Sequence, residues 1–154
     1  MAITKISDKG LPSGSVLQVV STTKTDATST TSGSFVDITG MSVAITPSAT
    51  SSKILILYDI GVSSSSHSRN DQVRLLRDAT TIVATANFFR LASGNSFMYN
   101  ASLNYIDEPS TTSATTYKLQ WLNEGGSNTS YLNRRGNSAD VFTASTITVM
   151  EIGA

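Results

Sequence analysis

Apolar and polar residues alternate along several short segments of this chain, and this alternation constrains the fold more than any other feature. The longest example runs from Phe97 to Tyr105, where every second residue is apolar and most residues between them are polar. Successive side chains of a β-strand point to opposite faces, so a period of two indicates a strand with one face on a core. Shorter alternations occur at residues 41–46 and 117–122.

The strongest predicted strand covers residues 53–62. Ile54 to Tyr58 form an uninterrupted apolar run, and the next charged residue after Lys53 is Asp59. A strand that is apolar on both faces is expected in the centre of a sheet, with protein packed against each side. We therefore expect this segment to be central and covered twice.

Other segments complete an all-β pattern. Short apolar runs at residues 16–20, 35–38, 131–132 and 146–152 have strand length, whereas the polar, Thr-rich residues 22–34 are expected to form a long loop or an edge segment. A hairpin is predicted where residues 73–77 and 81–84 flank a turn at residues 78–80. No segment has the length and period of a long helix.

These segments predict an all-β fold, a two-sheet antiparallel β-sandwich that is jelly-roll-like. The chain has 154 residues, which suits one domain, and we assign residues 15–154 to it. Periodicity alone does not distinguish a jelly roll from another Greek-key sandwich.

Residues 1–14 are predicted to form a short N-terminal arm. Charged residues, Pro12 and two glycines interrupt any regular pattern there, while Ile3, Ile6 and Leu11 are apolar. Two interpretations remain open: a frayed terminus, or a segment that becomes ordered on a partner. In the second case the three apolar residues would supply the contacts.

Composition excludes several classes of function. Eleven basic residues balance eleven acidic ones, so the excess of positive charge that is typical of nucleic-acid binding is absent. No apolar run approaches the length of a membrane span, and residues 1–6 do not resemble a signal peptide. We expect no nucleic-acid partner, no membrane insertion and synthesis in a cytoplasm.

The residues that commonly carry catalysis or bind metals are few. His67 is the one histidine and lies in a Ser-rich loop, cysteine is absent, and no phosphate-binding glycine motif occurs. Asp107 and Glu108 are adjacent at a strand end, so they should point to opposite faces instead of forming a catalytic pair. The sequence predicts no catalytic residues, no metal site and no cofactor; a glycan hydrolase would need two carboxylates held together in a cleft.

One group of residues is a candidate ligand surface. Tyr131, Arg134 and Arg135 are close in sequence, and Trp121 precedes them. Aromatic rings stack on sugar faces, and Arg donates paired hydrogen bonds to anions. The alternative for Trp121 is a core position, because it alternates in phase with Tyr117 and Leu119.

Several segments together resemble a known family of small virion proteins of bacteriophages. They are residues 14–20, 34–48, 51–56, 73–78 and 146–152, which span nearly the whole chain after residue 14. The chain is similar in these segments to capsid decoration (cement) proteins and tail-fibre head domains, especially those of cyanophages and marine phages. The resemblance rests on strand patterns and carries over no catalytic or binding residue.

The resemblance implies a jelly-roll-like homotrimer on the surface of a phage particle, in contact with the major capsid protein or other virion proteins. Trimer contacts would also explain apolar residues on both faces of residues 54–60, although burial within one subunit explains them equally well. Only about 14 residues precede the first predicted strand, which favours a compact capsid decoration protein whose arm, through Ile3, Ile6 and Leu11, grips the shell. The alternative is a tail-fibre head that recognises a host surface glycan or protein.

Overall fold

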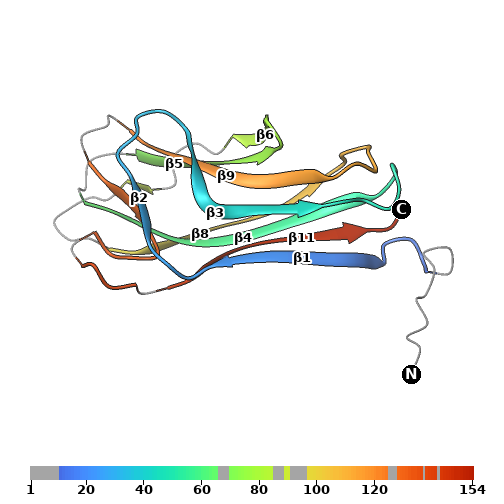
Figure 1. Ribbon diagram of the computed structural model, residues 1–154, viewed down its shortest axis with the longest axis horizontal. Helices are drawn as coiled ribbons and strands as arrows, with labels where there is room; N and C mark the ends of the chain where they lie inside the picture. The colour runs from blue at the N-terminus through green and yellow to red at the C-terminus, as the bar shows by residue number, and fades with distance from the viewer. Residues whose placement is uncertain are drawn as a thin grey trace, which may run out of the picture.

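A computed structural model describes residues 11–65, 70–84, 89–90, 97–124, 128–136, 138–141 and 143–154. In this part of the chain there are eleven strands and no helix (Figure 1). The strands are β1 (Val16–Lys24), β2 (Thr28–Thr30), β3 (Val36–Ile45), β4 (Lys53–Ser64), β5 (Asn70–Arg77), β6 (Thr80–Ala84), β7 (Phe89–Arg90), β8 (Tyr99–Asp107), β9 (Thr115–Asn123), β10 (Ser130–Leu132) and β11 (Ser145–Ile152).

The strands form two antiparallel sheets that pack face to face as the two layers of a sandwich (Figure 1). Sheet A contains β1, β11, β4, β10 and β2 in that order, with β8 on the other side of β4; sheet B contains β3, β9, β5 and β6, with β7 also paired to β5. The predicted two-sheet sandwich is confirmed.

The pairing order is that of a folded-back ribbon. Strands from opposite ends of the chain pair progressively inwards: β1 with β11, β3 with β9, β4 with β8, and β5 with β6. Pairing of β11 with β4 and of β9 with β5 then joins successive turns of the ribbon within each sheet. When such a ribbon is folded so that its strand pairs fall alternately in the two sheets, the result is a jelly roll. The structure thus distinguishes the jelly roll from the other Greek-key sandwiches that the sequence period allowed.

The core lies between the sheets and is built from the inward-facing half of each alternation. On β4, Ile54, Ile56, Tyr58 and Ile60 are buried, and they face the buried members of β3, β5 and β9. The burial pattern of β9 alternates without a break over all nine residues. The period of two in the sequence therefore identifies the core side of these strands correctly.

One of two local expectations was wrong. For the Thr-rich segment the edge alternative is confirmed, because β1 continues to Lys24, residues 28–30 pair with β10 as β2, and both strands lie at the ends of the order of sheet A. The expectation of separate strands at residues 35–38 and 41–46 was wrong. Residues 36–45 form one strand with a break in register between Asp37 and Ser42. Gly40 lies in this break with φ of +82°, a conformation that favours glycine, and the Lys24 side chain lies over it.

Side chains close the sandwich at the edge between β1 and β3. Gln18 Nε2 donates to the carbonyl of Thr46 at 2.7 Å, and Thr22 Oγ1 donates to the carbonyl of Ser42 at 2.8 Å. Carbonyl groups of edge strand β3 are thus occupied by β1 side chains. Such occupied groups are less available for pairing with a strand of another molecule.

Candidate interaction surfaces

An apolar row crosses the outer face of sheet A. The register places Ile106 of β8 beside Leu55 of β4, Leu55 beside Met150 of β11, and Met150 beside Val19 of β1. These positions are on the outward side of each strand, because their neighbours along the chain are more deeply buried. The row therefore spans four strands on the solvent side.

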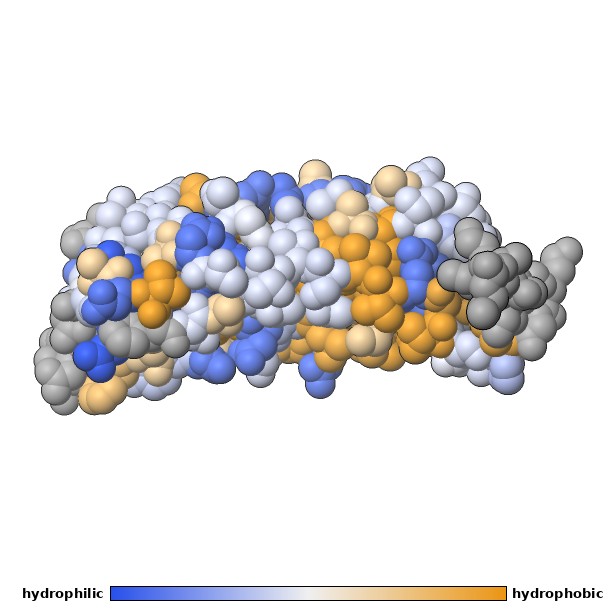
Figure 2. Space-filling model, turned by 60° about the horizontal axis from the view of Figure 1, so that its bottom comes forward, coloured by the Kyte–Doolittle hydropathy of each residue, from blue (hydrophilic) through white to orange (hydrophobic). Residues whose placement is uncertain are grey.

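Neighbouring outward residues widen this row into a continuous area. We define the apolar patch as Val16, Val19, Leu55, Leu57, Ile106, Met150 and Ile152. Val16, Val19 and Ile106 expose 51%, 55% and 56% of their surface, and the other four are half-buried. Figure 2 shows apolar side chains gathered in one area of this face, beside a pale area of weakly polar residues.

This patch corrects part of the expectation that residues 53–62 are covered on both sides: the outward side is open at residues 53–59, whereas residues 60–62 are all buried. β4 is central in its sheet, between β11 and β8, and its inner side is in the core. Its outward residues Leu55 and Leu57 have no second layer of described chain over them and remain half-buried. Burial within one subunit therefore explains only one of the two apolar faces.

Charge is sparse around the patch. Lys53 lies at its border, and its Nζ is 2.8 Å from Oε1 of Glu108. Farther along the same face, a shallow hollow is lined mainly by uncharged residues of β4, β8 and β11, with Asp59 as its one charged member among the described residues. The outer face of sheet A is thus apolar at one end and weakly polar at the other.

The outer face of sheet B is different, because charged and amide groups are linked across its strands. Asp37 accepts hydrogen bonds from Lys118 Nζ at 2.9 Å and Gln120 Nε2 at 2.6 Å, and the Arg74 guanidinium donates to Gln120 Oε1. Arg74 also lies over the ring of Phe35, 4.1 Å from its centroid. The bonds from Gln120 and Lys118 lower the pKa of Asp37. The outer face of sheet B is therefore polar, as expected of a surface exposed to water.

The candidate ligand residues do not all lie together. Trp121 is buried in the core with 4% exposure. This is the alternative that its alternation in phase with Tyr117 and Leu119 indicated. Tyr131 and Arg134 do meet: the guanidinium lies 4.3 Å from the ring centroid, and the carbonyl of Arg134 accepts a hydrogen bond from Ser63 Oγ at 2.5 Å. Arg135 is exposed. The surface group is therefore Tyr131, Arg134 and Arg135, without Trp121.

Of the predicted arm anchors, the structure describes Leu11. It is half-buried and lines a cavity of about 250 Å³ together with Leu17, Ser48, Gly153 and others. Ile3 and Ile6 lie outside the described residues. The cavity lies where the two ends of the domain meet, since the Gly14 amide donates to the Gly153 carbonyl at 2.7 Å.

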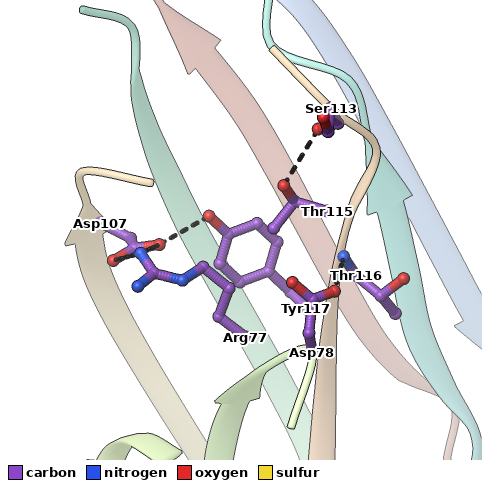
Figure 3. A network of polar contacts seen from close by, with 7 residues as sticks. All are labelled: Arg77, Asp78, Asp107, Ser113, Thr115, Thr116 and Tyr117. Carbon is purple, nitrogen blue, oxygen red and sulfur yellow. Dashed lines mark hydrogen bonds and ion pairs between the residues drawn. The ribbon is translucent and has the colours of Figure 1, made fainter. Parts of the chain in front are cut away.

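Buried carboxylates are the remaining groups that could carry chemistry. Asp107 faces inward, and both of its oxygens accept from Arg77 Nη1, at 2.9 and 2.8 Å (Figure 3). Tyr117 donates its hydroxyl to Asp107 Oδ2 at 2.7 Å, and burial together with this bond raises the pKa of Tyr117. Glu108 instead is exposed and pairs with Lys53. The two adjacent carboxylates point to opposite faces, as predicted, and Asp107 serves to link sheet A to sheet B.

Glu151 is a second buried carboxylate, 1% exposed, on the inner side of β11. It accepts from Gln18 Nε2 at 2.6 Å, from the amide and hydroxyl of Ser48 at 2.7 and 2.6 Å, and from Ser52 Oγ at 2.7 Å. Burial alone would raise its pKa, but these hydrogen bonds together lower it below the ordinary value. Glu151 thus joins β11 to β1 and to the turn before β4.

Asp71 is a third buried carboxylate, in β5 at the opposite end of the sandwich from Glu151. Its Oδ1 accepts from Asn123 Nδ2 at 3.1 Å, and the same amide group donates to Ser130 Oγ at 2.9 Å. Among the described residues, Asp71 Oδ2 has no hydrogen-bond partner. Burial raises the pKa of Asp71 to about 6, and repulsion from Glu124 acts in the same direction.

None of these groups forms a metal or catalytic cluster in the described part of the chain. No three His, Cys, Asp or Glu side chains gather there, and His67 lies outside the described residues. The same residues contain no helix that is long and apolar enough to cross a membrane.

Comparisons with known proteins find similarity in structure and none in sequence. No protein-family model and no curated protein sequence matches the chain. A chain in the structure of infectious bursal disease virus, Gt strain, is 17% identical with a TM-score of 0.54, covering 100% of this chain and 43% of the viral one. A chain of T=1 particles derived from the same virus is 15% identical with a TM-score of 0.50, covering 100% and 41%. This chain spans less than half the length of either viral chain, and the part it covers is similar to it in fold.

Proposed function

We propose that this chain is a non-enzymatic structural protein of a virus particle, where it assembles with other virion subunits. The supporting observation is the two-sheet, jelly-roll-like fold, which is similar over the whole chain to parts of chains in viral particles. The apolar patch on the outer face of sheet A adds to this, because a large uncovered apolar area on a folded domain marks a contact surface.

More specifically, we propose a homotrimeric decoration protein on the capsid of a bacteriophage. The mechanism is mechanical: the trimer binds neighbouring subunits of the assembled shell and does not bind the separate subunits. A ligand that binds one state selectively stabilises that state by mass action. The expected gain is resistance of the shell to heat and to mechanical stress.

Co-sedimentation tests this proposal. Purified protein is mixed either with particles from which it has been removed or with intact host cells, and the pelleted fraction is measured. Saturable binding to particles, with a rise in the temperature at which the shell opens, is expected. Binding to cells without binding to particles would contradict the decoration role.

The second candidate is a receptor-binding head of a tail fibre, and the Tyr131–Arg134 contact favours it. An aromatic ring with a guanidinium stacked on it, next to the exposed Arg135, offers both a face and hydrogen-bond donors to a surface glycan. On this alternative, R134A/R135A protein would lose binding to host cells. Unchanged cell binding by that variant would remove the candidate.

A further inference from the structure

We infer that the apolar patch on sheet A is the surface through which copies of this chain contact one another, an inference that rests on the proposed structural role. The starting point is β4, whose inner side chains are buried in the core while Leu55 and Leu57 point outward. The described chain supplies no layer over these two residues, so this face is available to a second copy.

The chemistry of the patch fits a second copy. Two copies related by a two-fold axis bring the same surface together, and copies around a three-fold axis do so at the axis itself. A charge at such a contact would face its own like charge. The patch contains only Val, Leu, Ile and Met side chains, and Lys53 at its border is already paired with Glu108. A glycan or a nucleic acid would instead require hydrogen-bond donors or cations, which these seven side chains lack.

The contact extends beyond the seven apolar side chains. A stable interface needs about 800 Å² from each partner, whereas apolar patches of a few hundred Å² are its usual centre. Uncharged polar residues adjoin the patch on the same face, among them Ser21, Asn104 and Thr148. An apolar centre with a polar rim is the usual organisation of an interface.

The contact is made face to face, not by strand addition at the β1–β3 edge. Side chains of Gln18 and Thr22 already occupy carbonyl groups of β3 there. The neighbouring outward residues Val16 and Val19 of β1 belong to the patch. A partner that covers the patch therefore packs against the sheet and leaves this edge closed.

The experiment measures molar mass by light scattering across a series of concentrations for the wild type, V19K/I106K and V36K. Val19 and Ile106 are the patch residues with the largest exposure on β1 and β8, and lysine there can reach solvent in a free subunit. Val36 is the matched control, since it is an exposed strand valine, 38% accessible, on sheet B. Far-UV circular dichroism and the melting temperature of the free subunit verify folding.

The inference predicts a multiple of the 16.3 kDa chain mass for the wild type and for V36K. V19K/I106K should be monomeric, with its dissociation constant raised at least tenfold. If the lysine variant does not fold, V19T/I106T replaces it with the same expected direction.

Several results would overturn the inference: a monomeric wild type at every concentration, a patch variant with unchanged mass, or equal loss of association in V36K. If V19K/I106K lost binding to particles while its molar mass stayed unchanged, the patch would instead be a contact with the shell. A dimer would support the surface and contradict the proposed trimer, so the two claims fail separately. Co-sedimentation with particles tests the virion role whatever the mass.

Discussion

At the scale of single residues, three buried carboxylates show how neighbouring groups determine whether a buried charge stabilises or destabilises the fold. Asp107 accepts hydrogen bonds from the guanidinium of Arg77 and the hydroxyl of Tyr117. Glu151 accepts four hydrogen bonds. Among the described residues, Asp71 accepts one hydrogen bond, from an amide to Oδ1, and none at Oδ2. Burying a charge is costly unless hydrogen bonds or an opposite charge compensate for it. We therefore expect Asp71 to lower stability at neutral pH and the other two to raise it.

Substituting Asp71 with Asn should stabilise the protein at pH 7. The folded-state pKa of about 6 exceeds the ordinary value of 3.8, so the folded state binds the proton more tightly and wild-type stability falls as pH rises from about 4 to about 6. D71N removes this cost, and we expect a gain of about 1–2 kcal/mol in the free energy of unfolding at pH 7.

Urea unfolding at a series of pH values checks this, with D59N at an exposed position as the control. The advantage of D71N should shrink as pH falls below about 6. A pH-independent difference, or a less stable D71N at pH 7, would show that Asp71 carries no such cost.

Substituting Glu151 with Gln should destabilise the protein, with the opposite dependence on pH. The lowered pKa means that the carboxylate contributes stability above its ordinary value of 4.5 and loses that contribution as pH falls through the folded-state value. Loss of a charged acceptor at the Gln18 contact should cost about 1–3 kcal/mol at pH 7. Denaturant midpoints for E151Q should approach those of the wild type in acid, while the exposed control E108Q should match the wild type throughout.

At the scale of elements, strands with strict alternation could be predicted from the sequence, and those defined by pairing could not. β8 and β9 were predicted because apolar side chains occupy every second position. β2 has three polar residues, and only its pairing with β10 makes it a strand. Asp71 likewise precedes the strand predicted at residues 73–77, yet it lies in β5, beside Asn123 and Ser130 from a distant part of the sequence.

The apolar patch was missed for the same reason, although the sequence contained a signal for it. Met150, Ile152 and Ile106 are apolar residues in the outward phase of their strands, where the alternation predicts polar ones. Each looks like an isolated exception until the register places Ile106, Leu55, Met150 and Val19 in one row. Breaks in alternation are thus informative only when the neighbouring strands are known.

Within β4, Gly61 is needed because the segment before β11 passes close over it. A Cβ at this position would lie 2.2 Å from Thr143 Cγ2. G61A should therefore lower the free energy of unfolding by about 1–3 kcal/mol through overpacking. The T143S substitution removes that methyl group, so G61A/T143S should recover most of the loss in thermal denaturation. Equal stability of G61A and the wild type would contradict the close contact.

At the scale of the whole molecule, the two outer faces of the sandwich are built for different surroundings. Sheet B presents a network of charged and amide groups, and sheet A presents the apolar patch (Figure 2). A domain that functions as a monomer in water does not need an apolar outer face. Assembly with other subunits, proposed above, accounts for it.

The N-terminal arm is predicted to act on attachment and not on folding. Removing residues 1–11 leaves every strand and the core intact, so the number of copies in the assembly should not change, and the melting temperature should fall only slightly through the loss of Leu11. Attachment to particles should weaken, because Ile3, Ile6 and Leu11 are removed. Quantitative co-sedimentation compares the truncated and full-length proteins, and equal attachment would exclude the arm as the anchor.

Immunogold labelling of purified phage particles with antibody against this chain tests the central claim most directly. The proposal predicts label distributed over the surface of the head, at many positions on each particle. Label confined to the tail or to fibre tips would contradict the decoration role and direct attention to Tyr131, Arg134 and Arg135. Particles without any label would contradict the virion role itself.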